Sequence, residues 1–220
     1  MTVLTLPKFL PSPEDFDLLV SKYKAFRLLS LQLSPESFGS THARELGFSN
    51  DTWISRVSNP LATSIVEVST SVSATSRPDA VSDHVQLLLK EEWLASLTLL
   101  GPLDREAAAK AFASDSHPEP EVVLHGDAKW HFLLNAMYVL PSARGRRLGG
   151  ALVEYAKTVA SGLVSEQKAR ILLVTDWENE GARRTYEKSG FEVVTRYWFD
   201  DYREGRTERT EAVVMKLDLN

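Results

Sequence analysis

The feature that most constrains the fold is an apolar segment that runs directly into a basic, glycine-containing loop and then into a helix. Residues 130–140 are mostly apolar and end at Pro141, and the loop that follows reads Arg144-Gly145-Arg146-Arg147-Leu148-Gly149-Gly150. An apolar stripe at helical spacing begins at Leu148. This order predicts a buried strand, a loop, and a helix that starts beside the end of the strand. Backbone N–H and guanidinium groups then gather at one helix N-terminus, which is the usual composition of a phosphate site.

Two widely used phosphate loops do not account for this segment. The P-loop requires a Lys directly after its glycines, and no Lys follows here. The dinucleotide fingerprint requires the spacing G-x-G-x-x-G, whereas the glycines here stand at 145, 149 and 150. A basic surface turn without a ligand is the structural alternative. The residues of the loop alone therefore leave phosphate binding and a plain basic turn both open.

Composition narrows the class of protein. The chain has 220 residues, of which 43% are hydrophobic and 25% charged, and this suits a globular domain with a substantial core. We expect a single domain over residues 1–220, with insertions at about 69–92 and 103–125. The net charge of −5 argues against a general nucleic-acid-binding surface. The basic loop therefore indicates a local site, and no nucleic-acid partner is expected.

The sequence also disfavours several kinds of site and location. It has no Cys, which excludes disulfides, thiol nucleophiles and Cys-ligated metals. Its 5 His residues lack the spacing of metal ligands, so no metal site is predicted. No apolar run approaches the ~20 residues that span a bilayer, and the N-terminus does not resemble a secretory signal. We therefore expect a cytoplasmic protein without a membrane partner.

Apolar periodicity and turn residues predict a series of helices and strands. Helices are expected over about 14–33, 41–58, 104–113, 148–163 and 179–189, and strands over about 63–68, 93–100, 130–140, 169–175, 191–199 and 211–219. Loops are expected over 69–92 and 114–121, after an extended lead-in over 1–13. After residue 130 the order begins as a parallel βαβ unit and ends as an antiparallel hairpin. It predicts a mixed α/β sheet with helices on both faces.

Side-chain directions follow from the same periods. In the strand before Pro141, alternate residues should share one face, namely His131, Leu133, Asn135, Met137 and Val139. In the next helix, the apolar stripe consists of Leu148, Leu152, Tyr155, Val159 and Leu163. The nearly uniform apolar run over 171–174 is typical of a strand that is buried on both faces.

A second motif downstream points to a family. Residues 175–191 contain the pattern Asn179-x-x-Ala182-x-x-x-Tyr186-x-x-x-Gly190-Phe191, about thirty residues after Arg144-Gly145-x-x-Leu148-Gly149. In this order and spacing, the two motifs together resemble those of the GNAT superfamily of N-acetyltransferases. The N-terminal half resembles the family more weakly, through Arg27, residues 34–40 and Trp53.

The resemblance implies a fold, a cofactor and a set of residues. The fold is a central mixed, mostly antiparallel sheet with a parallel, splayed strand pair and helices on both faces. The cofactor is acetyl-CoA, whose pyrophosphate binds the loop and whose pantetheine arm pairs with the splayed strand. The cofactor-binding residues implied in this way are Met137, Tyr138, Val139, Arg144, Gly145, Arg146, Arg147, Leu148, Gly149, Asn179, Ala182 and Tyr186.

The loop departs from the family at Arg147, where the family usually has Gly. An Arg can keep right-handed helical backbone angles and still offer its N–H group, so binding of the phosphates need not be lost. Its side chain could point to the 3′-phosphate of the nucleotide. If Arg147→Gly bound acetyl-CoA as tightly as the parent chain, this hypothesis about the side chain would fail.

Acetyl transfer to an amine defines the groups to look for. The amine must be neutral, the carbonyl oxygen must be stabilised, and the thiolate must leave, preferably with a proton. By the resemblance, Tyr186 is the candidate general acid, and the backbone N–H of Met137 or Val139 could polarise the carbonyl. Glu67, on a strand that often lines the acceptor pocket, is the tentative base or acceptor-binding residue. Weaker candidates are Glu36, His131 and Asn135, and a water relay without a dedicated base stays open.

Three hypotheses of function follow. The first is an acetyl-CoA-dependent N-acetyltransferase that acts on a primary amine of a small molecule or peptide, as a monomer or homodimer. The second is a non-catalytic acyl-CoA-binding or sensing module of the same fold, against which Tyr186 and the intact loop argue. The third is a phosphate- or nucleotide-binding α/β protein outside this family, which leaves residues 175–191 unexplained. The identity of the acceptor amine does not follow from the sequence.

Overall fold

The backbone is built around one sheet whose strands are interleaved with helices along the chain. The computed structural model describes residues 1–69, 81–112, 118–165, 167–201, 203 and 209–219. The strands are β1 (Thr2–Thr5), β2 (Ala62–Val68), β3 (Trp93–Leu103), β4 (Trp130–Val139), β5 (Ala169–Asp176), β6 (Glu192–Asp200) and β7 (Arg209–Leu219). The α-helices are α1 (Pro13–Leu33), α2 (His42–Leu46), α3 (Asn50–Ser58), α4 (Val81–Lys90), α5 (Arg105–Phe112), α6 (Pro120–Val123), α7 (Leu148–Val164) and α8 (Glu180–Lys188). Single 3₁₀ turns, η1 (Pro35–Ser37) and η2 (Pro141–Ala143), follow α1 and β4.

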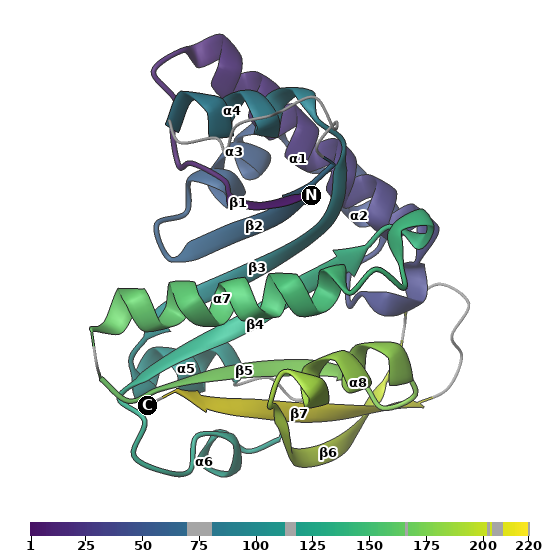
Figure 1. Cartoon of the computed structure of the whole chain (residues 1–220). Helices are drawn as coiled ribbons and strands as arrows, with labels where there is room; N and C mark the ends of the chain where they lie inside the picture. The colour runs from purple at the N-terminus through teal and green to yellow at the C-terminus, as the bar shows by residue number, and fades with distance from the viewer. Residues whose placement is uncertain (70–80, 113–117, 166, 202, 204–208, 220) are drawn as a thin grey trace.

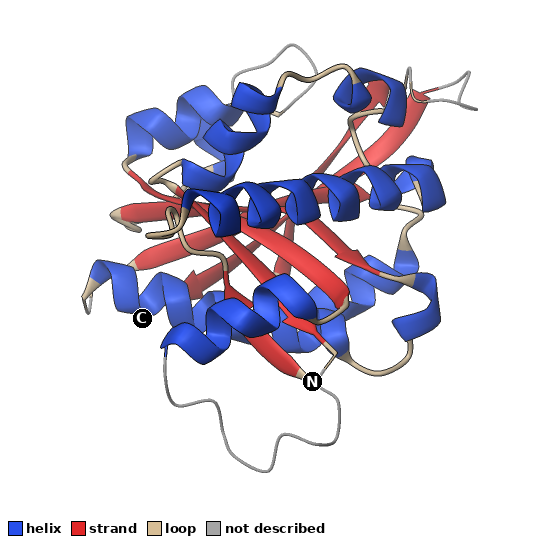
Figure 2. Cartoon of the chain, turned by 90° about the horizontal axis from the view of Figure 1, so that it is seen from above, coloured by secondary structure: helices blue, strands red, loops and turns tan. Residues whose placement is uncertain are grey.

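The described residues form a seven-stranded sheet in the order β1-β2-β3-β4-β5-β7-β6 (Figure 1). Neighbouring strands are antiparallel, except for β4 and β5, which run parallel. β6 and β7 form the antiparallel hairpin that the sequence predicts near the C-terminus. Helices cover both faces of the sheet (Figure 2). The predicted fold class, a mixed and mostly antiparallel sheet with one parallel pair, is therefore confirmed.

α7 lies across one face of the sheet because its sequence places small and branched apolar residues on one stripe. Leu148, Leu152, Ala156 and Ala160 are buried on successive turns. The two alanines let the helix come close to the strands beneath it. Leu163, which the apolar pattern assigns to this stripe, is instead 50% exposed, because the buried stripe continues through Val164. α8 lies on the same side and contacts α7 (Figure 1).

The opposite face carries two groups of helices. Phe26 of α1 packs against Trp93 of β3 and Tyr138 of β4, with ring centroids 5.9 and 6.2 Å apart. A second apolar cluster joins α5 and α6 to the sheet, with Phe112 and Leu133 among its members. Within the described ranges, no helix is both long enough and apolar enough to cross a membrane.

The N-terminal third differs in detail from the predicted elements. The extended lead-in contains β1, which pairs with β2 and becomes the edge of the sheet. The helix predicted over 41–58 is two helices, because α2 ends at Gly47 and α3 has a cap of its own. The Ser49 hydroxyl accepts the hydrogen bond of the Thr52 N–H group at 3.2 Å and so starts α3.

Both expected insertions contain helices. α4 lies within the segment predicted as a loop over 69–92 and packs against α1. α5 confirms the helix predicted over 104–113, and α6 occupies part of the loop predicted over 114–121. Residues 70–80 and 113–117 lie outside the described residues. The division into a single domain with two insertions stays a prediction.

His131 is a fully buried titratable side chain on β4. Among the described residues, neither of its ring nitrogens has a hydrogen-bond partner of normal geometry. Burial lowers the pKa of His131, and the nearby guanidinium groups of Arg170 and Arg105 lower it further, against smaller opposing effects of the Leu103 backbone and Asp218. The imidazole is therefore neutral in the folded protein at neutral pH.

His131→Phe should make the free energy of unfolding depend less on pH below neutrality. Because the pKa of His131 is lower in the folded than in the unfolded chain, the unfolded chain binds more protons as the pH falls through about 6.5, and folded-state stability is lost there. We expect the parent chain to lose more unfolding free energy than the variant between about pH 7.5 and about pH 5.5. Urea unfolding at both pH values measures this, and equal losses in the two proteins would contradict it.

Candidate functional site

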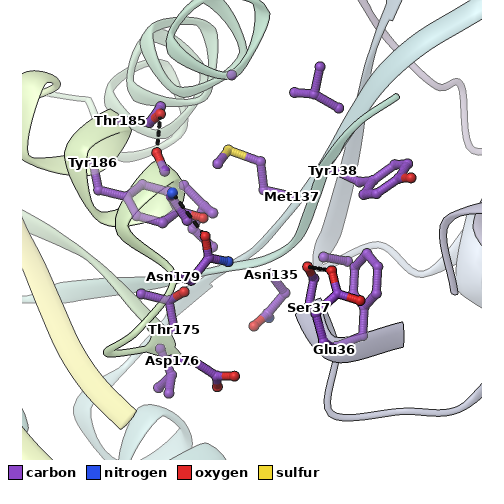
Figure 3. Close-up of a pocket in the computed structure, with 18 of the residues that line it drawn as sticks. Glu36, Ser37, Asn135, Met137, Tyr138, Thr175, Asp176, Asn179, Thr185 and Tyr186 are labelled. Carbon is purple, nitrogen blue, oxygen red and sulfur yellow. Dashed lines mark hydrogen bonds between the residues drawn. The ribbon is translucent and has the colours of Figure 1, made fainter. Parts of the chain in front are cut away.

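A cavity of about 1100 Å³ opens where β4 and β5 separate. The parallel ladder joins residues 130–133 to residues 169–172, and beyond it the described part of β4 pairs with β3 alone. The cavity walls come from β4, β5, the loop before α7, one side of α8 and residues 36–39 (Figure 3), and Arg203 and residues of β6 and β7 complete them. The edges that face each other across the opening therefore carry backbone groups that have no ladder partner there.

A β-bulge in β4 determines which side chains face this cavity. Thr98 and Ser96 of β3 pair with Asn135 and Tyr138 of β4, so β4 has one residue more than β3 over this stretch. Ala136, within the bulge, has a φ of 52°.

The bulge overturns the expectation that alternate β4 residues from His131 to Val139 share one face. Leu133 packs in the cluster with α5 and α6. A Cβ built on Gly149 of α7 would lie 3.8 Å from side-chain atoms of both Met137 and Val139, so these two residues face α7. The extra residue in the bulge therefore reverses the face of the sheet on which each side chain after Ala136 lies.

The basic loop meets the cavity at the N-terminus of α7. Leu148 is the first residue of α7, and the cap residue Arg147 offers no side-chain hydrogen bond, so the first N–H groups of the helix have no cap from this residue. The loop and helix residues that line the cavity are Arg144, Gly145, Arg147, Leu148, Gly149 and Gly150. The helix N-terminus and the two guanidinium groups give this end of the cavity a positive potential.

The three loop arginines have different surroundings. Arg144 Nε donates to the Val139 carbonyl at 3.2 Å, and Arg144 Nη2 donates to Ser34 Oγ at 3.1 Å. Arg146 does not line the cavity, and its Nη2 donates back to the Ser142 carbonyl at 3.2 Å. Arg144 is therefore held between the end of β4 and the end of α1, whereas Arg146 folds onto its own loop.

Arg147 adopts a backbone conformation that the sequence did not predict. Its φ of 63° and ψ of 18° lie in the left-handed region, so the expectation that it keeps right-handed helical angles is wrong. The chain needs this conformation to turn into α7, and glycine, the residue usual in the family, adopts it without steric cost. A side chain with a Cβ costs roughly 1–2 kcal/mol in this region.

α8 and the residue that caps it place Tyr186 and Asn179 on the wall of the cavity that faces β4 (Figure 3). Asn179 Oδ1 accepts the hydrogen bond of the Ala182 N–H group at 3.1 Å and caps the helix. Tyr186 is 6% exposed and packs on Phe191, with ring centroids 5.7 Å apart. Its ring lies beside Asn179 and faces Met137 across the cavity (Figure 3). Burial raises the pKa of Tyr186, so the phenol keeps its proton at neutral pH.

Glu67 lies apart from this cavity. It pairs with Val3 on one side and Ala95 on the other, and Ala95 pairs in turn with Val139, so the four residues lie in one row on the α7 side of the sheet. Glu67 is 4% exposed, its Oε2 atom has no hydrogen-bond partner among the described residues, and burial raises its pKa. It does not line the cavity.

Arg203 joins three segments at the end of the cavity that lies away from α7. Its guanidinium donates to both carboxylate oxygens of Asp201 and pairs with Asp176 Oδ2 at 2.8 Å. Its Nη1 atom also donates to the backbone carbonyl of Glu36 at 2.8 Å. Hydrogen bonding from Arg203 holds the pKa of Asp201 well below its usual range. Sequence reasoning missed Asp176, Asp201 and Arg203, although the position of Asp176 at the end of a buried apolar run was a usable signal.

Most of the predicted binding residues meet in this one cavity. Those that line it are Met137, Tyr138, Val139, Arg144, Gly145, Arg147, Leu148, Gly149, Asn179, Ala182 and Tyr186. Arg146 and Glu67 do not. This placement brings the residues together, and their roles stay predictions.

A mixed sheet with a splayed parallel pair and an open helix N-terminus beside it is the architecture that the resemblance to the GNAT superfamily implies. Residues 116–193 match the sequence model of the acetyltransferase (GNAT) domain. The resemblance is thereby confirmed. No curated protein matches the chain.

Solved structures with the same fold are distant in sequence. NAA60 from Arabidopsis thaliana, in complex with a bisubstrate analogue, is 18% identical with a TM-score of 0.57, and the alignment covers 100% of both chains. The same plant protein in complex with acetyl-CoA is 17% identical with a TM-score of 0.57, over 100% of this chain and 99% of that one. A GNAT superfamily phosphinothricin acetyltransferase from Sinorhizobium meliloti, in complex with acetyl-CoA, is 11% identical with a TM-score of 0.56, over 100% of this chain and 88% of that one. At these identities, the similarity establishes the fold.

Arg147→Gly should stabilise the protein without ligand by about 1 kcal/mol, because glycine adopts the left-handed angles of this position without a Cβ clash. Urea unfolding measures the gain. Arg146→Gly is the matched control, since Arg146 carries the same charge in the same loop but does not have a positive φ. An unchanged or lower stability of the Arg147 variant would contradict the strain at this position.

Proposed function

We propose that this protein is an acetyl-CoA-dependent N-acetyltransferase that transfers an acetyl group to a primary amine of a small molecule or peptide by direct attack. The observation that carries the proposal is the position of Tyr186, a buried and protonated phenol that lines the same cavity as the open N-terminus of α7. A module that only binds or senses acyl-CoA needs no proton donor at this place.

The α7 end of the cavity fits the diphosphate of acetyl-CoA. The first N–H groups of α7 are directed to the loop side, and Arg144 and Arg147 stand beside them. A Cβ on Gly149 would lie 3.4 Å from Thr185 and 3.8 Å from Met137, so a larger residue would fill space next to the helix N-terminus. The unpaired edge of β4 offers backbone groups that suit the amides of the pantetheine arm. The acetyl-CoA complexes of the two distant structures support this assignment.

The residues of this chain would then act at two atoms of the bound thioester, its carbonyl oxygen and its sulfur. Acetyl-CoA supplies an acetyl group activated as a thioester. The backbone N–H of Met137 or Val139 polarises the carbonyl oxygen of that group. The Tyr186 hydroxyl, which holds its proton because burial raises its pKa, donates the proton to the departing sulfur.

The proposal assigns no dedicated base. Glu67 does not line the cavity, and Asp176 is bound to Arg203. Asn135 occupies the β4 position that faces the opening, and an amide does not accept a proton at neutral pH. Glu36 lines the cavity but lies across the opening from Tyr186 (Figure 3). We infer that the attacking amine passes its proton to solvent at the open end of the cavity.

Tyr186→Phe should lower kcat by roughly a hundredfold, because the leaving sulfur loses its proton donor. The affinity for acetyl-CoA should stay within about twofold, since the ring and its packing on Phe191 are retained. Thiol release with a panel of primary amines measures turnover, and calorimetry measures binding. Tyr155→Phe is the control, because Tyr155 lies on α7 outside the cavity. Equal turnover of the parent and Tyr186→Phe would remove the assigned role, and binding without thiol release from any amine would favour a sensing module.

Arg147→Gly tests the contact between the loop and the nucleotide. If the Arg147 side chain binds the 3′-phosphate, the variant should bind acetyl-CoA about fivefold to tenfold more weakly, as expected for one exposed charge-assisted contact. Its affinity for acetyl-dephospho-CoA, which lacks that phosphate, should equal that of the parent. Calorimetry with both ligands separates the two cases. Equal weakening for both ligands would show that the backbone of the loop is affected and not a phosphate contact.

A further inference from the structure

We propose that the acceptor end of the cavity takes an amine that carries a second positive charge besides the amine that reacts. This inference rests on the proposed acetyltransferase function and deepens it. It concerns the substrate class.

The charges that line the cavity are distributed unequally between its two ends. Arg144 and Arg147 stand at the α7 end, where the helix N-terminus adds to their positive potential. The acidic residues Glu36, Asp176 and Glu178 also line the cavity, and Glu36 and Asp176 lie at the end away from α7 (Figure 3). Figure 3 shows Glu36 and Asp176 on opposite sides of the opening, with Asn135 between them. A cavity with this polarity suits an anionic ligand at one end and a cationic one at the other.

The two arginines that line this end of the cavity, Arg27 and Arg203, both form ion pairs with carboxylates. Arg203 is 8% exposed and is bound by both Asp201 and Asp176. Arg27 pairs with Glu45 at 2.7 Å, and Glu45 also pairs with Arg56 at 2.7 Å, so these three side chains together carry one positive charge. The Arg203 guanidinium pairs with two carboxylates, so that group carries one negative charge and the two groups balance. Glu36 adds a further negative charge to this end of the cavity.

Glu36 is the carboxylate best placed to meet a ligand. Its carboxylate accepts a hydrogen bond from Ser37 Oγ at 3.2 Å, and it forms no ion pair with a described residue. It is exposed, so a ligand can reach it. The hydrogen bond from Arg203 to its backbone carbonyl holds the residue at the rim of the cavity. A ligand cation would therefore meet an exposed carboxylate whose backbone is held at the rim of the cavity.

A separate observation marks where the reacting amine lies. The Tyr186 side chain is more than nine-tenths buried and lines the cavity, so a ligand atom in the cavity can contact its hydroxyl. Glu36 lies across the opening from Tyr186, whereas Asp176, which is bound to Arg203, lies on the Tyr186 side below Asn179 (Figure 3).

This separation explains why the second charge matters. A carboxylate next to the attacking amine would favour its ammonium form, which has no lone pair with which to attack. The same carboxylate placed away from the reacting atoms binds a distal cation without this penalty. The acidic end therefore suits a second cationic group on the acceptor and not the amine that reacts.

The test compares acceptors that differ only at the distal group. A straight-chain diamine, an amino alcohol and an amino acid of equal length present a cation, a neutral group and an anion there, and thiol release from acetyl-CoA gives kcat/KM for each. We expect the order diamine, amino alcohol, amino acid. Glu36→Gln should lower kcat/KM for the diamine by about fivefold and leave the amino alcohol unchanged, as expected for one exposed ion pair. A peptide pair with Lys or norleucine after the reacting N-terminus shows whether a peptide supplies the second cation.

The controls separate the two proposals. Glu180→Gln removes the same charge from α8 at a residue outside the cavity, and it should leave the preference for the diamine unchanged. Equal use of the three acceptors, or an unchanged preference in Glu36→Gln, overturns the second-charge inference while the acetyltransferase function stands. Absence of thiol release with every acceptor overturns both.

Discussion

The separation of β4 from β5 is the constraint on which the rest of the site depends. A parallel ladder of four residue pairs holds the strands together at one end, and the bulge at Ala136 carries β4 away at the other. Because a sheet cannot leave backbone groups unpaired in its interior without a compensating partner, the opening must be solvated or filled by a ligand. The same separation exposes Asn135 in the middle of the sheet and lets Tyr186 reach the opening from α8.

The sequence predicted those parts of the site that short segments determine. The strand, loop and helix around residues 144–149 follow one another directly, so composition and period were enough to place an open helix N-terminus beside a strand end. Asn179 caps α8, and Tyr186 lies two turns further along the same helix, so their common direction is a local property. Gly47 and Ser49 carried the signals that divide α2 from α3, but the prediction did not use them.

The parts that the sequence did not predict depend on pairing or on distant segments. The direction of Met137 and Val139 depends on one extra residue relative to β3, which is defined only once the strands have paired. The left-handed angles of Arg147 contradict ordinary residue preference, and the turn into α7 imposes them. The alternating pattern of β2 correctly predicts that Glu67 lies on one face of a strand. That face is covered by α7 and does not reach the opening between β4 and β5. No local pattern relates Arg203 to Glu36.

The hydrogen bond from Arg203 to Glu36 spans 167 positions of the chain. Closing so long a loop costs entropy, and the contact forms only after both of its ends are docked on the sheet. The α7 end of the cavity is instead built from a loop and a helix that are adjacent in sequence. The two ends of one cavity therefore differ in how they are assembled: a continuous strand, loop and helix form the α7 end, and segments far apart in the sequence meet at the rim. Substitutions in the rim segments can therefore alter which acceptor binds while the loop and helix that face the cofactor stay the same.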